Sequence, residues 1–176
     1  VASRNAPGVA GSSLLAVLNT ASRLSCTRWR KYHQVSVECS PELPLINVEK
    51  SPMILCFINL IINASDAMGE TPGKVLIRAS LKSGRVQVTL DDDGPGIPAH
   101  LRQSVFEAFF TTKPEGQGTG LGLALCRDFL DHIGGTIEAG SSPDRCGARI
   151  LLTLPVLEDE QTSGQSGAAE AMSSVR

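Results

Sequence analysis

The chain has 176 residues, a formal net charge of −2 and an apolar share of 41%. This length indicates one domain, with apolar residues concentrated between about Leu43 and Leu157. Lysine and arginine are scattered, so we expect no nucleic-acid track and no polybasic patch through which this chain contacts a membrane. The longest apolar run falls short of the ~20 residues that a membrane span needs, and no signal peptide is visible. Five cysteines without zinc-site spacing indicate a reduced, cytoplasmic protein.

The start of the chain predicts a linker over residues 1–12 and then a short helix capped by Ser12 or Ser13. We expect residues 1–30 to be this linker and the end of a preceding helical segment. Residues 31–156 then form the main domain, and residues 157–176 a disordered tail or linker. Because the chain does not begin with Met, we expect it to be part of a longer protein, for which an upstream membrane anchor is compatible with this domain.

Between these ends, strand and helix patterns alternate. A long helix is predicted in the stretch Ser51–Glu70, with Ser51 as N-cap, Pro52 as its first residue and a break from Gly69 to Gly73. A second long helix is opened by Thr119 or Gly120 and ends before Gly134. A short helical turn is expected at 98–106. Strands are predicted at residues 33–39, 45–48 (a short piece), 74–81, 85–90, 136–139 and 148–154. The strands at 74–81 and 85–90 are expected to pair about a turn at Lys82-Ser83-Gly84.

The first long helix is apolar almost all the way round and therefore predicts a core element. Its exception is one narrow polar stripe formed by Asn59, Asn63, Asp66 and Glu70. Asn and Asp are mediocre helix formers, so a merely solvated stripe would more often use Lys, Glu or Gln. The stripe indicates a polar site for a cation and its ligand, and an ordinary exposed helix edge is the alternative.

The segment DDDGPGI, residues 91–97, directly follows a predicted strand. Its two glycines let the backbone turn sharply and come close to a flat ligand. Asp92 then lies at a strand end, where its carboxylate can accept a hydrogen bond from an exocyclic amine such as that of adenine. The alternative is an ordinary acidic turn.

A glycine-rich loop, residues 116–122, runs into the second long helix. Exposed backbone N–H groups and the positive end of the helix dipole together favour phosphate. The loop is neither a Walker motif nor a dinucleotide-binding fingerprint, because no Gly-Lys-Ser/Thr follows and no strand precedes it. A flexible linker is the alternative reading.

Three of the five phenylalanines, Phe106, Phe109 and Phe110, precede that loop. They predict a hydrophobic anchor for the loop. The polar residues Thr111–Lys113 lie just beyond the anchor, where a hydroxyl or an ammonium can reach a phosphate. A loop pinned to the core, with a solvated lysine, is the alternative.

The order of these motifs resembles that of the Bergerat ATP-binding fold, and most closely the catalytic and ATP-binding (HATPase) domain of bacterial sensor histidine kinases. NLIINASDAM resembles the Asn box of that family, DDDGPGI its first glycine box, VFEAFFTTKP its Phe box and GTGLGLAL its second glycine box. The resemblance covers roughly Leu43 to Pro155. It implies a two-layer α/β sandwich with a mixed, mostly antiparallel sheet covered by about three helices.

The resemblance also implies a set of site residues. Asn63, assisted by Asn59, would ligate Mg²⁺, which takes few protein ligands. The catalytic residues would be Asn59, Asn63 and Lys113, with Lys113 in a mobile lid. The residues implied for ATP binding are Asn59, Asn63, Asp66, Asp92, Gly94, Gly96, Ile97, Thr111, Thr112, Lys113, Gly118, Thr119, Gly120, Leu121, Gly122 and Leu123.

Position 59 bears on the reaction. In related Bergerat ATPases a glutamate four residues before the metal-binding Asn activates water, whereas Asn59 cannot take a proton at neutral pH. The resemblance thus implies phosphoryl transfer to a histidine on a separate dimerisation domain, in a homodimeric protein, followed by relay to the aspartate of a response regulator. His33, His100 and His132 lack the acidic neighbour usual for that acceptor. The alternatives are a stand-alone serine kinase of the anti-sigma-factor type and a nucleotide-binding module without transfer.

Two positions depart from the family pattern. Asp66 stands where many members have Lys or Arg near the phosphates, so charge compensation would fall on Mg²⁺ and Lys113. Ala148 replaces a Thr that often supports the adenine-binding aspartate. We expect this second change to weaken nucleotide binding by one hydrogen bond, about 1 kcal/mol.

Overall fold

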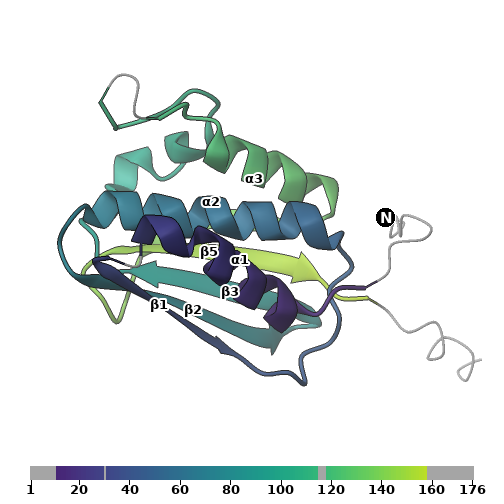
Figure 1. Ribbon diagram of the computed structural model, residues 1–176. Helices are drawn as coiled ribbons and strands as arrows, with labels where there is room; N and C mark the ends of the chain where they lie inside the picture. Colours follow the sequence, from purple (N-terminus) through teal and green to yellow (C-terminus); the bar gives the residue numbers. More distant parts are fainter. Residues whose placement is uncertain (1–10, 30, 115–117, 158–176) are drawn as a thin grey trace, which may run out of the picture.

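The structure, a computed structural model, describes residues 11–29, 31–114 and 118–157. Helices α1, α2 and α3 lie on one face of a five-stranded sheet (Figure 1), which confirms the predicted two-layer α/β sandwich. The elements in chain order are α1 (Leu14–Trp29), β1 (His33–Cys39), α2 (Lys50–Met68), β2 (Gly73–Lys82), β3 (Arg85–Asp92), the 3-10 turns η1 (Ala99–Leu101) and η2 (Ser104–Phe106), α3 (Gly122–His132), β4 (Thr136–Ser141) and β5 (Ala148–Pro155).

The sheet has the strand order β1-β2-β3-β5-β4. Strand β1 pairs in parallel with β2, and all other neighbouring pairs are antiparallel, as predicted. Strands β2 and β3 form a hairpin whose turn residues Ser83 and Gly84 have φ angles of 50° and 72°. Because β3 is flanked by β2 on one side and β5 on the other, the residues at its C-terminal end are held by two neighbouring strands.

The core lies between the sheet and the helical layer. On β3 the alternate residues Val86, Val88 and Leu90 are buried, as expected for a strand with one face covered. From α2, Phe57 and Ile61 are fully buried against them in the same hydrophobic cluster. The apolar periodicities of strand and helix therefore meet in one core.

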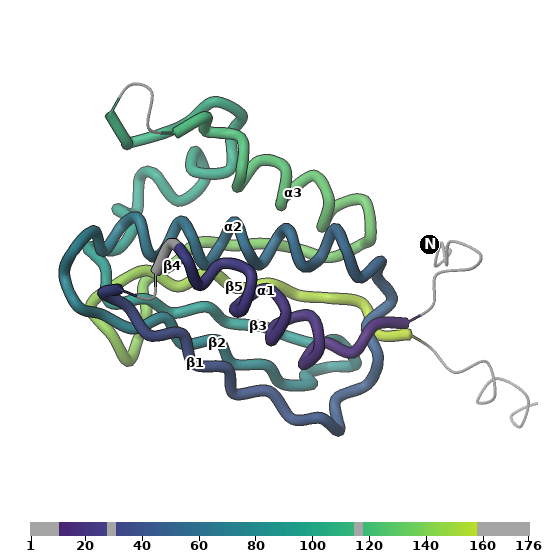
Figure 2. The backbone as a smooth tube through the Cα atoms, in the orientation of Figure 1, coloured from purple at the N-terminus to yellow at the C-terminus, as the bar shows by residue number. Residues whose placement is uncertain are grey.

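Helix α1 packs alongside α2 (Figure 2), and its buried residues belong to that same core. These residues are Leu14, Val17, Leu18 and Ala21. Next to it, Ser12 N–H donates to the carbonyl of Ile46 over 2.9 Å. Helix α1 therefore shares one hydrophobic core with α2 and the sheet.

Helix α2 begins two residues earlier than predicted. Its N-cap is Glu49, not Ser51, and Pro52 is the third helical residue. Proline is tolerated there because the N–H groups of the first turn have no partner within the helix. The helix ends as predicted at a glycine, Gly69, with φ 63°. By length and composition α2 could cross a membrane, but its apolar residues lie largely in the core, apart from Leu55, which is 61% exposed.

Helix α3 begins later than predicted, at Gly122, with Leu121 as its N-cap. Gly120 has φ 64°, a left-handed conformation that cannot continue into a right-handed helix. Ala124, Cys126 and Leu130 face the core, whereas Leu125 is 59% exposed. The later start leaves the loop before Gly122 non-helical.

Candidate functional site

Asp91 and Asp92 end β3, Asp93 follows directly, and each of the three carboxylates has a different environment. The Asp91 carboxylate is buried and receives two bonds from the Arg149 guanidinium, at 2.6 and 2.7 Å. Asp93 accepts a bond from the Lys74 backbone N–H at 2.8 Å and pairs with Arg145. Because successive side chains of a strand point to opposite faces, Asp92 points away from the side on which Asp91 lies.

Asp92 is buried, with only 5% of its surface exposed. Its Oδ1 accepts hydrogen bonds from the backbone N–H groups of Gly94, at 2.9 Å, and Ala148, at 3.0 Å. Burial raises the pKa of Asp92 above the ordinary aspartate value. The two backbone hydrogen bonds oppose this rise, and the neighbouring carboxylates of Asp93 and Asp91 add to it. Ala148 thus supports Asp92 through its main chain, which does not require a threonine side chain.

Glycines surround Asp92 at positions where a Cβ would collide with Asp92 or would need a strained backbone. A Cβ added to Gly147 would lie 2.1 Å from the Asp92 carbonyl oxygen. Gly96 has φ 80° and faces the Gly147 backbone, 3.6 Å from the position of its own missing Cβ. We call Asp92, Gly94, Gly96, Gly147 and Ala148 the Asp92 turn. It presents a fixed carboxylate beside bare backbone, an arrangement suited to a flat ligand with an amine.

A second group of residues lies where α2 meets the start of α3. A Cβ added to Gly122 would lie 3.5 Å from Asn59 Cγ and Oδ1, so Asn59 faces the first residue of α3. Asn63 follows one turn along α2, and both amides are half-buried. The N-terminal N–H groups of α3 lack partners within the helix and attract anions.

The segment before α3 reaches back to α2. Lys113 Nζ lies 2.7 Å from Asp66 Oδ2, and the Lys113 N–H donates to Thr111 Oγ1 over 3.1 Å. Asn59, Asn63, Asp66, Lys113 and Gly122 are named the α2–α3 corner. The polar stripe of α2 is therefore covered in part by the segment after η2 and is not an ordinary solvated edge.

The ends of this segment are joined by a backbone contact. Phe109 N–H donates to the Gly120 carbonyl over 2.9 Å, and a Cβ on Gly120 would lie 2.4 Å from the Phe109 carbonyl carbon. Phe109 itself has φ 69° and is 74% exposed. Of the three predicted anchor residues, Phe106 is buried and Phe110 is half-buried, so the prediction was wrong for Phe109.

The remaining predicted site residues lie around these two groups. Ile97 and Leu123 are half-buried against the core, and Leu121 is half-buried as the N-cap of α3. Thr111, Thr112, Gly118 and Thr119 are exposed. Sequence reasoning missed Gly147 and the Asp93–Arg145 pair, because their roles come from the loop between β4 and β5 lying against the end of β3. The one signal in the sequence was a glycine, Gly147, directly before Ala148 at the start of the last predicted strand.

The polar groups of the Asp92 turn and the α2–α3 corner fit a nucleotide better than a metal ion held by protein side chains alone. Among the described residues, no three or more His, Cys, Asp or Glu side chains are grouped so as to hold a metal. The Asp92 turn offers a carboxylate acceptor, and the α2–α3 corner offers amide oxygens, an ammonium and helix N–H groups. A hard cation such as Mg²⁺ accepts oxygen ligands and keeps several waters, so the Asn oxygens plus ligand phosphates fit it.

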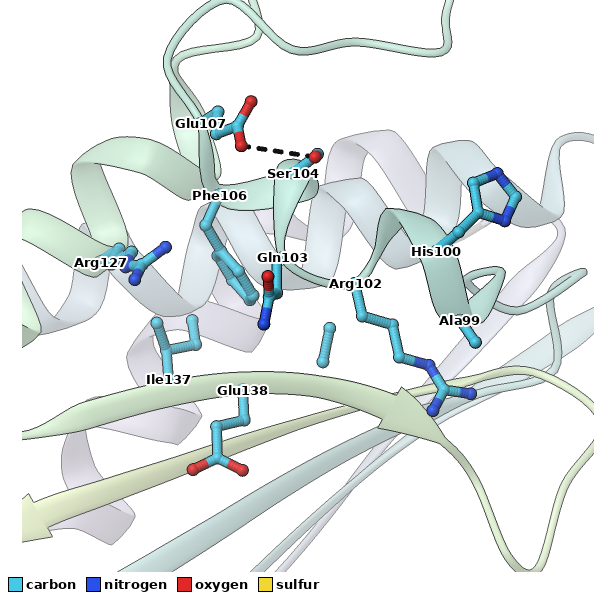
Figure 3. A pocket seen from close by; sticks show the side chains of 11 residues that line it. Ala99, His100, Arg102, Gln103, Ser104, Phe106, Glu107, Arg127, Ile137 and Glu138 are labelled. Carbon is cyan, nitrogen blue, oxygen red and sulfur yellow. Dashed lines mark hydrogen bonds between the residues drawn. The ribbon is translucent and has the colours of Figure 1, made fainter.

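A separate hollow of about 740 Å³ lies between the η1–η2 segment, α3 and the edge strand β4 (Figure 3). Phe106 and Arg127 point into it from above, and Ile137 points up from β4. No residue predicted for the site lines it. The residues lining it are Ala99, His100, Arg102, Gln103, Ser104, Phe106, Glu107, Arg127, Ile137, Glu138 and Ala139.

Comparisons with known proteins agree with this geometry. Residues 49–158 match the family described as histidine kinase-, DNA gyrase B- and HSP90-like ATPase. The sensory histidine kinase/phosphatase NtrB of Azospirillum brasilense is 34% identical over 146 residues, which are 75% of this chain and 36% of NtrB. The sensor histidine kinase ZraS of Escherichia coli O157:H7 is 36% identical over 123 residues, 70% of this chain and 26% of ZraS. The chain thus spans well under half the length of these two relatives.

Solved structures give the same result. The nucleotide-free catalytic domain of the histidine kinase ThkA superposes with a TM-score of 0.74 at 30% identity, over 84% of this chain and 95% of that domain. Full-length ShkA in complex with AMPPNP superposes with a TM-score of 0.73 at 28% identity, over 85% of this chain and 31% of ShkA. The chain therefore belongs to the family of histidine kinase-, DNA gyrase B- and HSP90-like ATPases, and it is an ATP-binding catalytic domain of the sensor histidine kinase type.

Proposed function

We propose that this domain binds Mg²⁺·ATP and donates the γ-phosphoryl group to a histidine on the dimerisation domain of its own protein, for relay to a response-regulator aspartate. The observation that carries the proposal is that Asn59 on α2 faces Gly122 at the start of α3, where an added Cβ would lie 3.5 Å from the Asn59 amide. It brings an amide, and no carboxylate, to the position next to the phosphate-binding helix start. The full protein is a homodimer in this proposal.

The Asp92 turn selects the base. Oδ1 of Asp92 is held by two backbone N–H groups, which fixes the plane of the carboxylate and leaves Oδ2 for the adenine amine. Guanine presents a carbonyl oxygen at the corresponding position, and a carboxylate repels it. Gly94 and Gly96 let the ring approach the backbone, and Ile97 packs beside it.

The α2–α3 corner holds the phosphates. Backbone N–H groups of Gly118, Gly120, Leu121 and Gly122 donate to phosphate oxygens, reinforced by the dipole of α3. Asn63, with Asn59, supplies amide oxygens to Mg²⁺, which neutralises charge on the phosphates when bound. Lys113 makes a further contact to the phosphates, and the hydroxyls of Thr111, Thr112 and Thr119 are further donors to them. Leu123 packs against the core below the phosphate site.

Asn59 decides between transfer and hydrolysis. A carboxamide cannot accept a proton at neutral pH, so it orients a ligand but does not activate water. Phosphoryl transfer depends mainly on positioning and charge stabilisation, and these are the properties of this corner. The acceptor histidine is supplied from outside the described residues.

The acceptor domain docks on the exposed apolar residues beside this corner. Phe109, 74% exposed, adjoins Gly120, and Leu125, 59% exposed, lies one turn along α3 from Leu121. Exposed apolar groups next to a reactive site mark a surface for a partner. A helical domain docked here would place its histidine near the transferred phosphate. We place the domain in the cytoplasm, where ATP and the response regulator are present.

Calorimetry with ATP, with and without Mg²⁺, tests the site. We expect the wild-type chain to bind, Asp92→Asn to lose nucleotide and Asn63→Ala to lose mainly the Mg²⁺ dependence. Absence of binding by the wild-type chain would overturn the assignment.

Transfer is tested with labelled ATP and the dimerisation domain of the full-length protein added in trans. We expect labelling of a histidine, lost on acid treatment and absent with Asn63→Ala. An acid-stable product would favour the serine kinase, and ATP binding with no transfer would favour a nucleotide-binding module.

A further inference from the structure

The ion pair between Lys113 and Asp66 joins segments 47 residues apart in the chain. Nζ and Oδ2 are 2.7 Å apart, and the two side chains are 32% and 25% exposed. Asp66 lies on the polar stripe of α2, one turn beyond Asn63. The pair therefore stands directly beside the residues that we assign to the phosphates.

The Lys113 side chain is held by more than this pair. Its backbone N–H is bonded to Thr111 Oγ1, and a Cβ added to Gly118 would lie 3.2 Å from Lys113 Cδ. The stem of Lys113 is thus packed against a residue of the glycine-rich loop. The ammonium needs only a rotation of its side chain to exchange one anion for another.

When a triphosphate binds, the α2–α3 corner holds two kinds of anion, the Asp66 carboxylate and the phosphates, close to one cation, Lys113. An Asp66 carboxylate repels phosphate, and it occupies the one ammonium that the described part of the corner offers. Partly exposed ion pairs are weak, so a phosphate bearing a higher charge can replace Asp66 as the partner of Lys113. Asp66 is then an internal competitor of the nucleotide.

We propose that Asp66 lowers the affinity of the domain for nucleotide phosphates by competing with them for Lys113. This inference rests on the proposed function, since the competing ligand is the bound ATP. Asp66 acts through Lys113 and is a specificity-determining residue: it penalises ligands by their phosphate charge and leaves recognition of the base unchanged.

The first test compares nucleotide affinities by calorimetry. We expect Asp66→Asn to bind Mg²⁺·ATP about twofold to fivefold more tightly than wild type. Adenosine, which carries no phosphate, should bind both equally. Asp128→Asn, which removes an exposed carboxylate farther along α3, is the matched control and should leave both affinities unchanged. If the pair only supports the fold, Asp66→Asn weakens ATP or changes adenosine binding, and the inference is overturned.

The second test follows the Lys113 ammonium. Acylation by an N-hydroxysuccinimide ester is measured by mass spectrometry, with exposed Lys82 as internal reference. We expect Lys113 to react severalfold faster in Asp66→Asn than in wild type, and Mg²⁺·ATP to restore its protection in the variant. If ATP binds without protecting Lys113, Lys113 does not exchange partners and the inference fails, while the proposed function stands. If ATP does not bind the wild-type chain, the proposed function itself has failed.

Discussion

The Asp92 turn and the α2–α3 corner hold their functional groups in different ways. Asp92 is buried and bonded to backbone N–H groups from the turn after β3 and from the first residue of β5, whereas the partly exposed Lys113 has its ammonium engaged in one ion pair, with Asp66. Two backbone hydrogen bonds and the close approach of the Gly147 backbone to Asp92 hold the Asp92 turn in one arrangement. An exposed ion pair can exchange its partner. The comparison indicates a rigid site for the base beside an adjustable site for the phosphates.

The strongest way to break the rigid site is Gly147→Ala. The added Cβ would lie 2.1 Å from the Asp92 carbonyl oxygen and 2.3 Å from its Oδ1, so the β4–β5 loop must move. We expect a loss of about 2–3 kcal/mol in the free energy of unfolding, measured with urea, and loss of adenosine binding. Gly140→Ala, where nothing lies within 4 Å of the added Cβ, is the control. Equal stability of the two variants would contradict the close packing at Gly147.

Asp92→Asn tests the carboxylate itself. The amide keeps the acceptor oxygen for Gly94 and Ala148 but places an N–H₂ group near the adenine amine. We expect ATP and adenosine affinity to fall roughly 10- to 100-fold, because a hydrogen bond to a charged group is lost. The melting temperature at neutral pH should rise, since an unfavourably buried charge is removed. A variant that binds adenosine like wild type would exclude Asp92 as the base-selecting group.

Gly120→Ala should break the phosphate site alone. Its φ of 64° and the Phe109 carbonyl carbon at 2.4 Å leave no room for a Cβ. We expect ATP affinity to fall about tenfold, while adenosine affinity is kept. Gly134→Ala has a similar φ, 72°, with open space around it, so it shares the backbone strain without the collision. Parallel losses of ATP and adenosine binding would show that the two groups of residues are not independent.

The pH dependence of adenosine binding gives the smallest effect. Because burial raises the pKa of Asp92, binding should weaken with falling pH at a midpoint above the ordinary aspartate value of 3.8. The free energy of folding changes in the opposite direction to adenosine binding, because the folded state binds the Asp92 proton more tightly than the unfolded state does. The contribution of Asp92 to folding therefore becomes more favourable as pH falls through its raised pKa and less favourable as pH rises through it. A titration of adenosine affinity by NMR checks the midpoint, and a value at or below 3.8 would contradict the burial argument.

Local signals in the sequence were enough for much of the fold. The hydrophobic periods of α2 and β3, the turn at Ser83-Gly84 and the stop at Gly69 depend on short-range chemistry. For the same reason, the order of the Asn, glycine and Phe boxes identified the family, which the comparisons confirm. The boundaries were less predictable: the start of α3 depends on the left-handed Gly120, and that conformation is set by contact with Phe109.

By itself, the sequence determined which residues are available for chemistry: the amide stripe with Asn59 in place of a base, the three aspartates after a strand and the glycines before a helix. Only the tertiary structure decided which of these residues meet. Arg149 and Arg145 engage Asp91 and Asp93, and Ala148 supports Asp92, because β5 pairs with β3 across a separation of about 60 residues. The Asp66–Lys113 pair likewise depends on contact between distant segments. Local periodicity predicts an element, but a specific partner is chosen by packing.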